Sequence, residues 1–154
     1  MGGKCFAMHD TKVATDIKRY GWHCLHVSPA LGEKGCVFTY SIGFAKSYGA
    51  PEIAVFGMQQ DKAHSLLSEC ATLLRNGYVI RFDVEDPNVL AGDYNVIFRP
   101  VRPAYRGEYF GTAMRYYADK AFTAAVMFLP DRQHRFPWEA GYDYVPVDEA
   151  LAIV

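Results

Sequence analysis

The chain has 154 residues, of which 51% are hydrophobic and 21% are charged, and its formal net charge is −1 at pH 7. This length suits one domain with a substantial core, and the composition is that of a globular protein and excludes a disordered one. The balanced charge removes the electrostatic argument for binding nucleic acid or an anionic membrane, which requires an excess of basic residues or a basic face. Nucleic acid is therefore not an expected partner.

No apolar stretch approaches the length of a membrane span, and the amino-terminal MGGKCFAMHD has no apolar signal core. We therefore expect a cytoplasmic protein with no membrane partner. Cys24, Cys36 and Cys70 lie in apolar patterns without a C-x-x-C pair, which predicts free thiols and no metal site. The glycines form neither G-x-G-x-x-G nor a P-loop, so no cofactor is expected.

The first third of the chain predicts a tail, a short helix and three strands. Residues 1–9 are expected to be a flexible amino-terminal tail, and residues 10–154 a single globular domain. Asp10 or Thr11 can cap a helix that ends at Gly21. Two alternating stretches would then pair as an antiparallel hairpin, and a third, apolar on both faces, predicts a central strand: GWHCLHV (21–27), CVFTYSIGF (36–44) and EIAVFG (52–57).

The remainder of the chain predicts two longer helices among further strands. DKAHSLLSECATLLRNG (61–77) repeats apolar residues at helical spacing, and RGEYFGTAMRYYADK (106–120) predicts the second helix. Strands are expected at YVIRF (78–82), YNVIFRPV (94–101) and AAVMFL (124–129), with a short strand and a short helix in the tail 143–154. Because strands come in pairs and helices do not alternate strictly with them, the pattern predicts an α+β domain. Its sheet is expected to be mainly antiparallel, with two principal helices packed on it.

The loop PDRQHRFPWEAGYD (130–143) combines two prolines, two arginines, a histidine, a tryptophan and three carboxylates. In one interpretation it binds a small anionic ligand: Arg132 and Arg135 present guanidinium groups, Trp138 offers a stacking surface, and Asp131 accepts backbone N–H groups of the loop. In the other, Asp131 and one arginine form an internal salt bridge while Phe136 and Trp138 fill the core. Residue types alone leave both interpretations open.

A pair of histidines offers acid–base chemistry. His23 and His26 are three residues apart on a predicted strand, so they point to opposite faces and do not bind one metal together. An enzyme built from this chain would use His23 or His26 as acid or base and Tyr40 as a proton donor. Arg132 or Arg135 would then hold an anion.

Several stretches, taken in order, carry a resemblance: GWHCLHV, FTYSIGF, APEIAVFG, a helix ending in RNG, YNVIFRPV and FLPDRQHRFPW. They resemble a bacterial family catalogued as a domain of unknown function, DUF4262, whose members have a G-W strand, a Y-[TS]-I-G-[LF] strand, a P-E-[LI] strand and a W-P-D-R-x-x-R-F-P-W-type ending. The likeness runs from about Asp16 to Asp143, and D-R-x-x-R-F-P-W is its most specific part. The resemblance implies a bacterial origin and a cytosolic setting, but no known reaction.

Two positions depart from that pattern. Leu129 stands where the family often has Trp, and His134 stands where it often has Gly. The first departure implies a different wall for any pocket, and the second an addition particular to this chain.

Two functions follow as hypotheses. The first is a non-catalytic bacterial accessory module, such as an immunity or regulatory protein, which binds a small anionic ligand or a protein partner. The many tyrosines would also suit a homodimer. The alternative is a small enzyme, a hydrolase or transferase, with a His acid or base and an Arg anion clamp. The enzyme requires His23, Tyr40, Arg132 and Arg135 to face one pocket.

Overall fold

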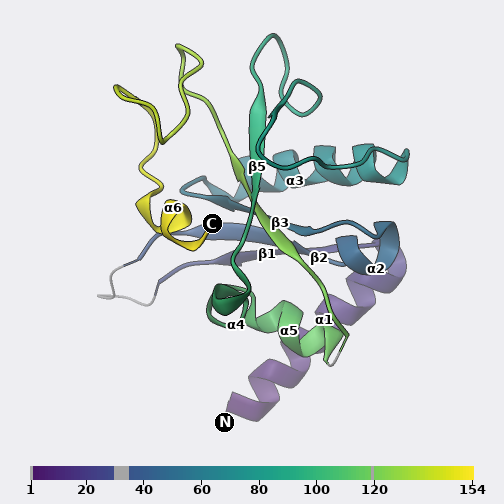
Figure 1. Ribbon diagram of the computed structural model, residues 1–154. Coiled ribbons are helices and arrows are strands. Elements are labelled where there is room, and N and C mark those ends of the chain that lie inside the picture. The colour runs from purple at the N-terminus through teal and green to yellow at the C-terminus, as the bar shows by residue number, and fades with distance from the viewer. Residues whose placement is uncertain (1, 30–34, 119) are drawn as a thin grey trace.

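The computed structural model describes residues 2–29, 35–118 and 120–154, with side chains described from Asp10 onward. A six-stranded mixed sheet, with strand order β1-β2-β3-β6-β5-β4, forms its centre (Figure 1). In chain order the strands are β1 His23–Val27, β2 Phe38–Ile42, β3 Glu52–Phe56, β4 Glu85–Asp86, β5 Val96–Pro100 and β6 Ala124–Phe128. Neighbouring strands pair antiparallel except β3 and β6, which run parallel.

The helices are α1 Gly2–Tyr20, α2 Phe44–Tyr48, α3 Gln60–Arg75, the single 3₁₀ turn η1 Pro103–Tyr105, α4 Arg106–Tyr109, α5 Gly111–Tyr117 and α6 Asp148–Ile153. Apolar residues of α1, α5 and α6 pack against one face of the sheet, and those of α3 pack against the other. The result is a single α+β domain with the sheet between two layers, and the predicted fold class is confirmed.

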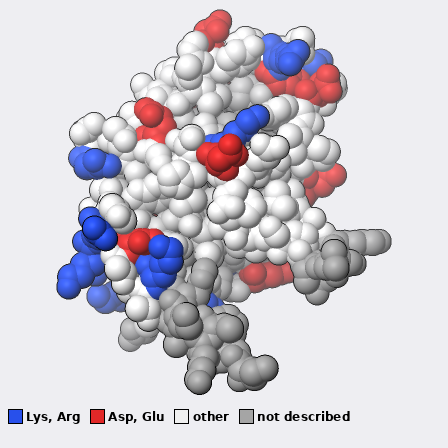
Figure 2. All heavy atoms as spheres, turned by 180° about the vertical axis from the view of Figure 1, so that it is seen from behind, with Lys and Arg blue, Asp and Glu red and all other residues white. Residues whose placement is uncertain are grey.

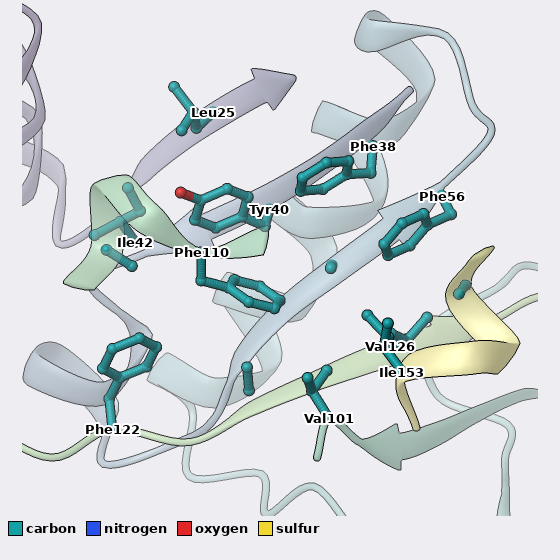
Figure 3. Packing of buried hydrophobic residues seen from close by; sticks show 14 of the residues in the cluster. Leu25, Phe38, Tyr40, Ile42, Phe56, Val101, Phe110, Phe122, Val126 and Ile153 are labelled. Carbon is teal, nitrogen blue, oxygen red and sulfur yellow. The ribbon is translucent and has the colours of Figure 1, made fainter. Parts of the chain in front are cut away.

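Strand alternation explains how one sheet serves two cores. Along β6, Val126 and Phe128 belong to the cluster under α1, α5 and α6, while Ala125 and Met127 belong to the cluster under α3. The first cluster is rich in rings (Figure 3). In it, Tyr40 lies edge-on to Phe110 with ring centroids 4.8 Å apart, and Phe38 stacks on Phe56 at 4.9 Å.

Two predictions about strands are confirmed. The stretches 21–27 and 36–44 contain β1 and β2, which form an antiparallel hairpin with His23 opposite Ile42 and Val27 opposite Phe38. The apolar stretch 52–57 contains β3, which lies inside the sheet and is buried along its whole length. A strand covered on both faces has no need of polar alternation.

Other boundaries differ from the predictions. Helix α1 includes residues 2–9, where a tail was expected; this stretch contains no proline that would stop a helix. Residues 78–82 form no strand except for a single bridge from Phe82 to Phe98, because β4 takes the adjacent place beside β5. The helix expected at 106–120 is broken at Phe110, whose non-helical backbone (φ −116°, ψ 39°) brings its ring into the core. No strand precedes α6 among residues 143–147.

Candidate functional site

The candidate site lies where β3 and β6 end. Because these strands run parallel and adjacent, their carboxyl ends meet at the same edge of the sheet, and the segments that follow them lie together. After β3 the chain passes through Met58 into α3, and after β6 it enters the loop 129–143. Figure 1 shows this loop and the segment that precedes β5 extending past the sheet on the same side.

These segments enclose a cavity of about 950 Å³, which is called the β3–β6 cavity below. Its size falls within the range of small-molecule sites. Aliphatic side chains form part of its wall: Met58, Leu66, Leu90 and Leu129. Polar and aromatic side chains complete it, among them Asp61, Lys62, Tyr94, Asp131, Arg132, Asp143 and Tyr144. The cavity thus combines an apolar wall with two cations, Lys62 and Arg132, and three carboxylates, of which Asp131 is paired with Arg135.

Asp131 gives the loop its shape. Its side chain is buried, and it accepts hydrogen bonds of 2.9 Å from the backbone N–H groups of Gln133, Arg135 and Asp143 and from the Nε of Arg135. Burial by itself raises the pKa of Asp131, but the backbone N–H groups and the Arg135 guanidinium outweigh it and lower the pKa to about 2. The charge of Asp131 is therefore already satisfied inside the loop.

Arg135 and Trp138 are committed to internal partners. Besides its bond to Asp131, the Arg135 guanidinium donates to Gln133 Oε1 at 3.1 Å. The Trp138 ring stacks on Phe136, with centroids 5.4 Å apart, and the Arg99 guanidinium lies 3.6 Å from its centroid. Neither Arg135 nor Trp138 lines the β3–β6 cavity. The salt-bridged interpretation of the loop thus describes Arg135, although Trp138 stays 37% exposed instead of filling the core.

Arg132 lies in a different position from Arg135. It is exposed and lines the cavity beside Asp131, as the ligand-binding interpretation of the loop requires. Each interpretation of the loop therefore describes one of the two arginines. Arg132 lines the cavity, and Arg135 forms the internal salt bridge that holds the loop.

Both departures from the family pattern lie at this site. Leu129 forms part of the cavity wall. His134 has φ +65°, a conformation that glycine adopts readily and other residues rarely do. Its imidazole stacks on Tyr94, another cavity residue, with ring centroids 4.6 Å apart. In this chain His134 therefore occupies a backbone conformation that suits glycine, and its ring packs against Tyr94 of the cavity wall.

The catalytic candidates lie outside this cavity. His23 is buried and its Nδ1 lies 2.8 Å from an Asp16 oxygen of α1. His26 Nδ1 lies 2.6 Å from the hydroxyl oxygen of Thr39, on the other face of the sheet. Tyr40 is 1% exposed and packs in the core under α5. None of His23, His26 and Tyr40 lines the β3–β6 cavity with Arg132.

Glu52, at the amino end of β3, forms a second carboxylate centre that the sequence analysis missed. It is fully buried. It accepts hydrogen bonds from the backbone N–H groups of Gly43 (3.0 Å), Phe44 (3.0 Å) and Ala45 (3.2 Å) and from the hydroxyls of Ser41 (2.8 Å) and Tyr117. Burial raises the pKa of Glu52, and these donors oppose the rise. A lone carboxylate at the head of an apolar strand was the available signal.

Most of the cavity was also missed. Lys62 lay in the predicted helix 61–77, Leu90 between two predicted strands and Tyr94 at the start of the strand 94–101, and none of them was expected at a site. Their approach to Arg132 depends on β6 pairing with both β3 and β5, which no local pattern reveals.

The described part of the chain contains no group of three or more His, Cys, Asp or Glu side chains that could hold a metal ion. Within the same residues, no helix has the length and apolar character needed to cross a membrane.

The fold and the site together define a single α+β domain with a ligand-sized cavity at one edge of a mixed sheet. The chain belongs to the family described as a domain of unknown function, DUF4262, whose model matches residues 16–143. The resemblance seen in the sequence is therefore confirmed, and the matched range includes nearly all of the cavity wall. No curated protein and no solved structure matches the chain significantly.

Proposed function

We propose that the protein is a non-catalytic accessory module of the bacterial cytoplasm that binds a small organic anion in the β3–β6 cavity. The observation that carries this proposal is the combination, in one cavity, of an aliphatic wall with the cations Lys62 and Arg132. A guanidinium matches a carboxylate or phosphate with two parallel hydrogen bonds, and an ammonium adds a point charge. The aliphatic wall favours a ligand with an apolar body.

The carboxylates around the cavity do not cancel this preference. Asp131 is occupied by four donors and contributes little free acceptor capacity. Asp61 accepts the backbone N–H of Lys62 at 2.9 Å, in the first turn of α3. Asp61 and Asp143 are exposed, so they favour a ligand that also carries a hydroxyl or amino group.

The enzyme alternative has less support. A hydrolase or transferase with a histidine acid or base and an arginine clamp requires both groups in one pocket. His23, His26 and Tyr40 lie away from the cavity that Arg132 lines. A binding module, by contrast, requires nothing beyond the cavity itself. Such a module would act as a regulatory or immunity-type protein, on a protein partner or as a homodimer, with the ligand biasing that interaction.

Native mass spectrometry tests the proposal. The untagged protein is taken from a bacterial lysate, and its native mass is compared with its denatured mass. We expect an excess of a few hundred daltons on the native protein, because the cavity has the volume of a small-molecule site. The excess should disappear in Arg132→Gln and persist in Arg81→Gln, which alters an exposed arginine outside the cavity.

The melting temperature separates a binding role from a structural one. Arg132→Gln should leave the melting of the ligand-free protein unchanged, since the Arg132 side chain is exposed. A native protein without excess mass, or an excess that Arg132→Gln retains, would count against the cavity as the binding site.

A further inference from the structure

A second hollow runs along α3 from His64 to Arg75, around the edge of the sheet that β1 forms. It has a volume of about 1230 Å³ and is called the α1–α3 groove below. Three elements provide most of its wall: α1 with Thr11, Lys12, Thr15, Asp16, Arg19 and Tyr20, the start of β1 with Trp22, His23 and Cys24, and α3 with His64, Ser68 and Arg75. The groove shares neither Lys62 nor Arg132 with the β3–β6 cavity.

The groove is basic in a chain that is slightly acidic overall. Lys12, Arg19 and Arg75 face one carboxylate among its described residues, that of Asp16, whereas the whole chain carries a net charge of −1. Figure 2 shows Lys and Arg side chains gathered over the part of the surface where α1 lies, with an acidic side chain between them. A hollow lined by charges of one sign concentrates ligands of the opposite charge.

The one carboxylate is already engaged. Asp16 lies 2.8 Å from His23 Nδ1 and 3.5 Å from Lys12 Nζ. Among the described residues, neither Arg19 nor Arg75 takes part in an ion pair. The two arginines, one from each helix, therefore keep their guanidinium groups available to an anion.

The positive charges are spread along the groove. Lys12 and Arg19 lie seven residues apart on α1, a rise of about 10 Å, and Arg75 approaches from α3. A single phosphate group spans a much shorter distance than this. The spacing therefore suits a ligand with two or more phosphate groups.

Aromatic rings lie in the same groove. Trp22 and His64 stack with ring centroids 5.7 Å apart and an interplanar angle of 22°. Such a pair offers a flat surface next to the cations. Cys24, beside it, is not an activated nucleophile, because burial raises the pKa of its thiol to about 11. The groove therefore offers a ligand an aromatic surface and cations, and Cys24 adds no activated thiol.

We propose that the α1–α3 groove binds a small molecule that carries two or more phosphate groups, held between Arg19 of α1 and Arg75 of α3. Two kinds of molecule share this chemistry: a nucleotide, whose base would stack against Trp22 and His64, and a phosphorylated molecule without a base. Recognition would differ from the glycine-rich cradles, since side chains of two helices provide the contacts.

Tryptophan fluorescence gives a direct test. The chain has two tryptophans, so Trp138→Phe leaves Trp22, which lines the groove, as the single emitter. Titration with ADP, AMP, adenosine and inorganic pyrophosphate would be followed by Trp22 emission, and by calorimetry for pyrophosphate. We expect ADP and pyrophosphate to bind and adenosine to bind at least tenfold more weakly. Affinity should fall as salt is raised, because exposed charges are screened.

Matched variants locate the site. Arg19→Gln and Arg75→Gln, singly and together, should weaken binding, by at least tenfold in the double variant. Lys18→Gln removes the neighbouring positive charge on α1 outside the groove and should change affinity less than twofold. Circular dichroism of each variant checks that α1 and α3 remain folded, as expected for exposed side chains.

The arms of the experiment also distinguish the two kinds of ligand. Tighter binding of ADP than of pyrophosphate, lost in His64→Ala, identifies a nucleotide. Equal affinities, unaffected by His64→Ala, identify a phosphorylated molecule without a base. No binding of either probe up to about 5 mM, or equal weakening by Lys18→Gln and Arg19→Gln, would overturn the proposal.

Discussion

A buried carboxylate lies at each end of the parallel strands β3 and β6, but the groups that surround the two carboxylates differ. At the amino end, Glu52 is enclosed by neutral donors from α2, β2 and α5. At the carboxyl end, Asp131 accepts three backbone N–H groups and one guanidinium in a surface loop. The first end is sealed, whereas the second opens into the β3–β6 cavity.

The two ends differ in which polar groups are left to contact a ligand once each carboxylate has its hydrogen-bond donors. Around Glu52, burial raises the pKa, and the groups that contact the carboxylate donate to it and leave it out of reach of a ligand. Around Asp131, the bound guanidinium and N–H groups lower the pKa to about 2, and the fixed loop carries Arg132 to the cavity. A carboxylate with all its hydrogen bonds made thus stabilises a core in one place and positions Arg132 at the cavity in the other.

The largest effect is expected at the sealed end. Glu52→Gln replaces one carboxylate oxygen with an NH₂ group that would face backbone N–H donors, so buried donors lose their acceptor. We expect unfolding free energy to fall by about 3 kcal/mol. Urea denaturation at neutral pH measures the change. Tyr117→Phe, which removes one donor and keeps the carboxylate, should cost about 1 kcal/mol; an equal loss in both variants would contradict this account of Glu52.

At the open end, Asp131→Asn should lower the melting temperature by less than Glu52→Gln does, and the effect should depend on pH. The folded-state pKa of Asp131, about 2, lies below that of an unfolded aspartate, near 3.9. Its contribution to stability is therefore complete above about pH 4 and is lost as the pH falls toward 2. Melting curves at pH 7, 4 and 2.5 should show the wild type and the variant converging. A gap that stays constant over this range would exclude the charge of Asp131 as its cause.

Leu129→Trp tests the cavity with little expected effect on the fold. The larger indole, which the family often has at this position, should occupy part of the β3–β6 cavity and abolish ligand retention in native mass spectrometry. Stability should change by less than about 1.5 kcal/mol, since the cavity has room for the ring. Leu129→Met, similar in volume, is the control and should retain the ligand. Retention by the tryptophan variant would move the binding site elsewhere.

The smallest effect is expected at His134. His134→Gly relieves a side chain held at φ +65° but removes the stack on Tyr94, and each of these terms is worth about 1 kcal/mol. The two should nearly cancel in chemical denaturation. In a Tyr94→Ala background the stack is already absent, so His134→Gly should become stabilising. Destabilisation there would show that the ring has a further partner.

The sequence predicts individual helices and strands better than it predicts which strands lie next to each other in the sheet. The hairpin of β1 and β2, the buried strand β3 and helix α3 follow from local alternation and helical spacing. The insertion of β6 between β3 and β5 does not, because strand partners depend on interactions far apart in the chain. The loop 130–143 was a candidate site because of its own residues. Lys62, Leu90 and Tyr94 were not candidates, because only the strand pairing brings them to the same cavity.

Side-chain roles show the same limit. The sequence offered Arg132 and Arg135 as equals, and their difference arises from a turn in which only Arg135 reaches back to Asp131. The pairing of His23 with Asp16 joins a strand to a helix, and helical spacing alone does not predict it. Tyr40 was a candidate proton donor, but it is buried against Phe110, and the position of Phe110 depends on the break between α4 and α5.

The central claim is that the open end binds a small organic anion and the sealed end does not. Two-dimensional ¹H–¹⁵N NMR during titration with a panel of small aliphatic and aromatic carboxylates tests it most directly. The account predicts saturating shifts of amide signals around Lys62, Leu90 and Gln133, with those of Gly43 and Phe44 unmoved. No saturating shift for any carboxylate, or shifts centred away from the β3–β6 cavity, would contradict it.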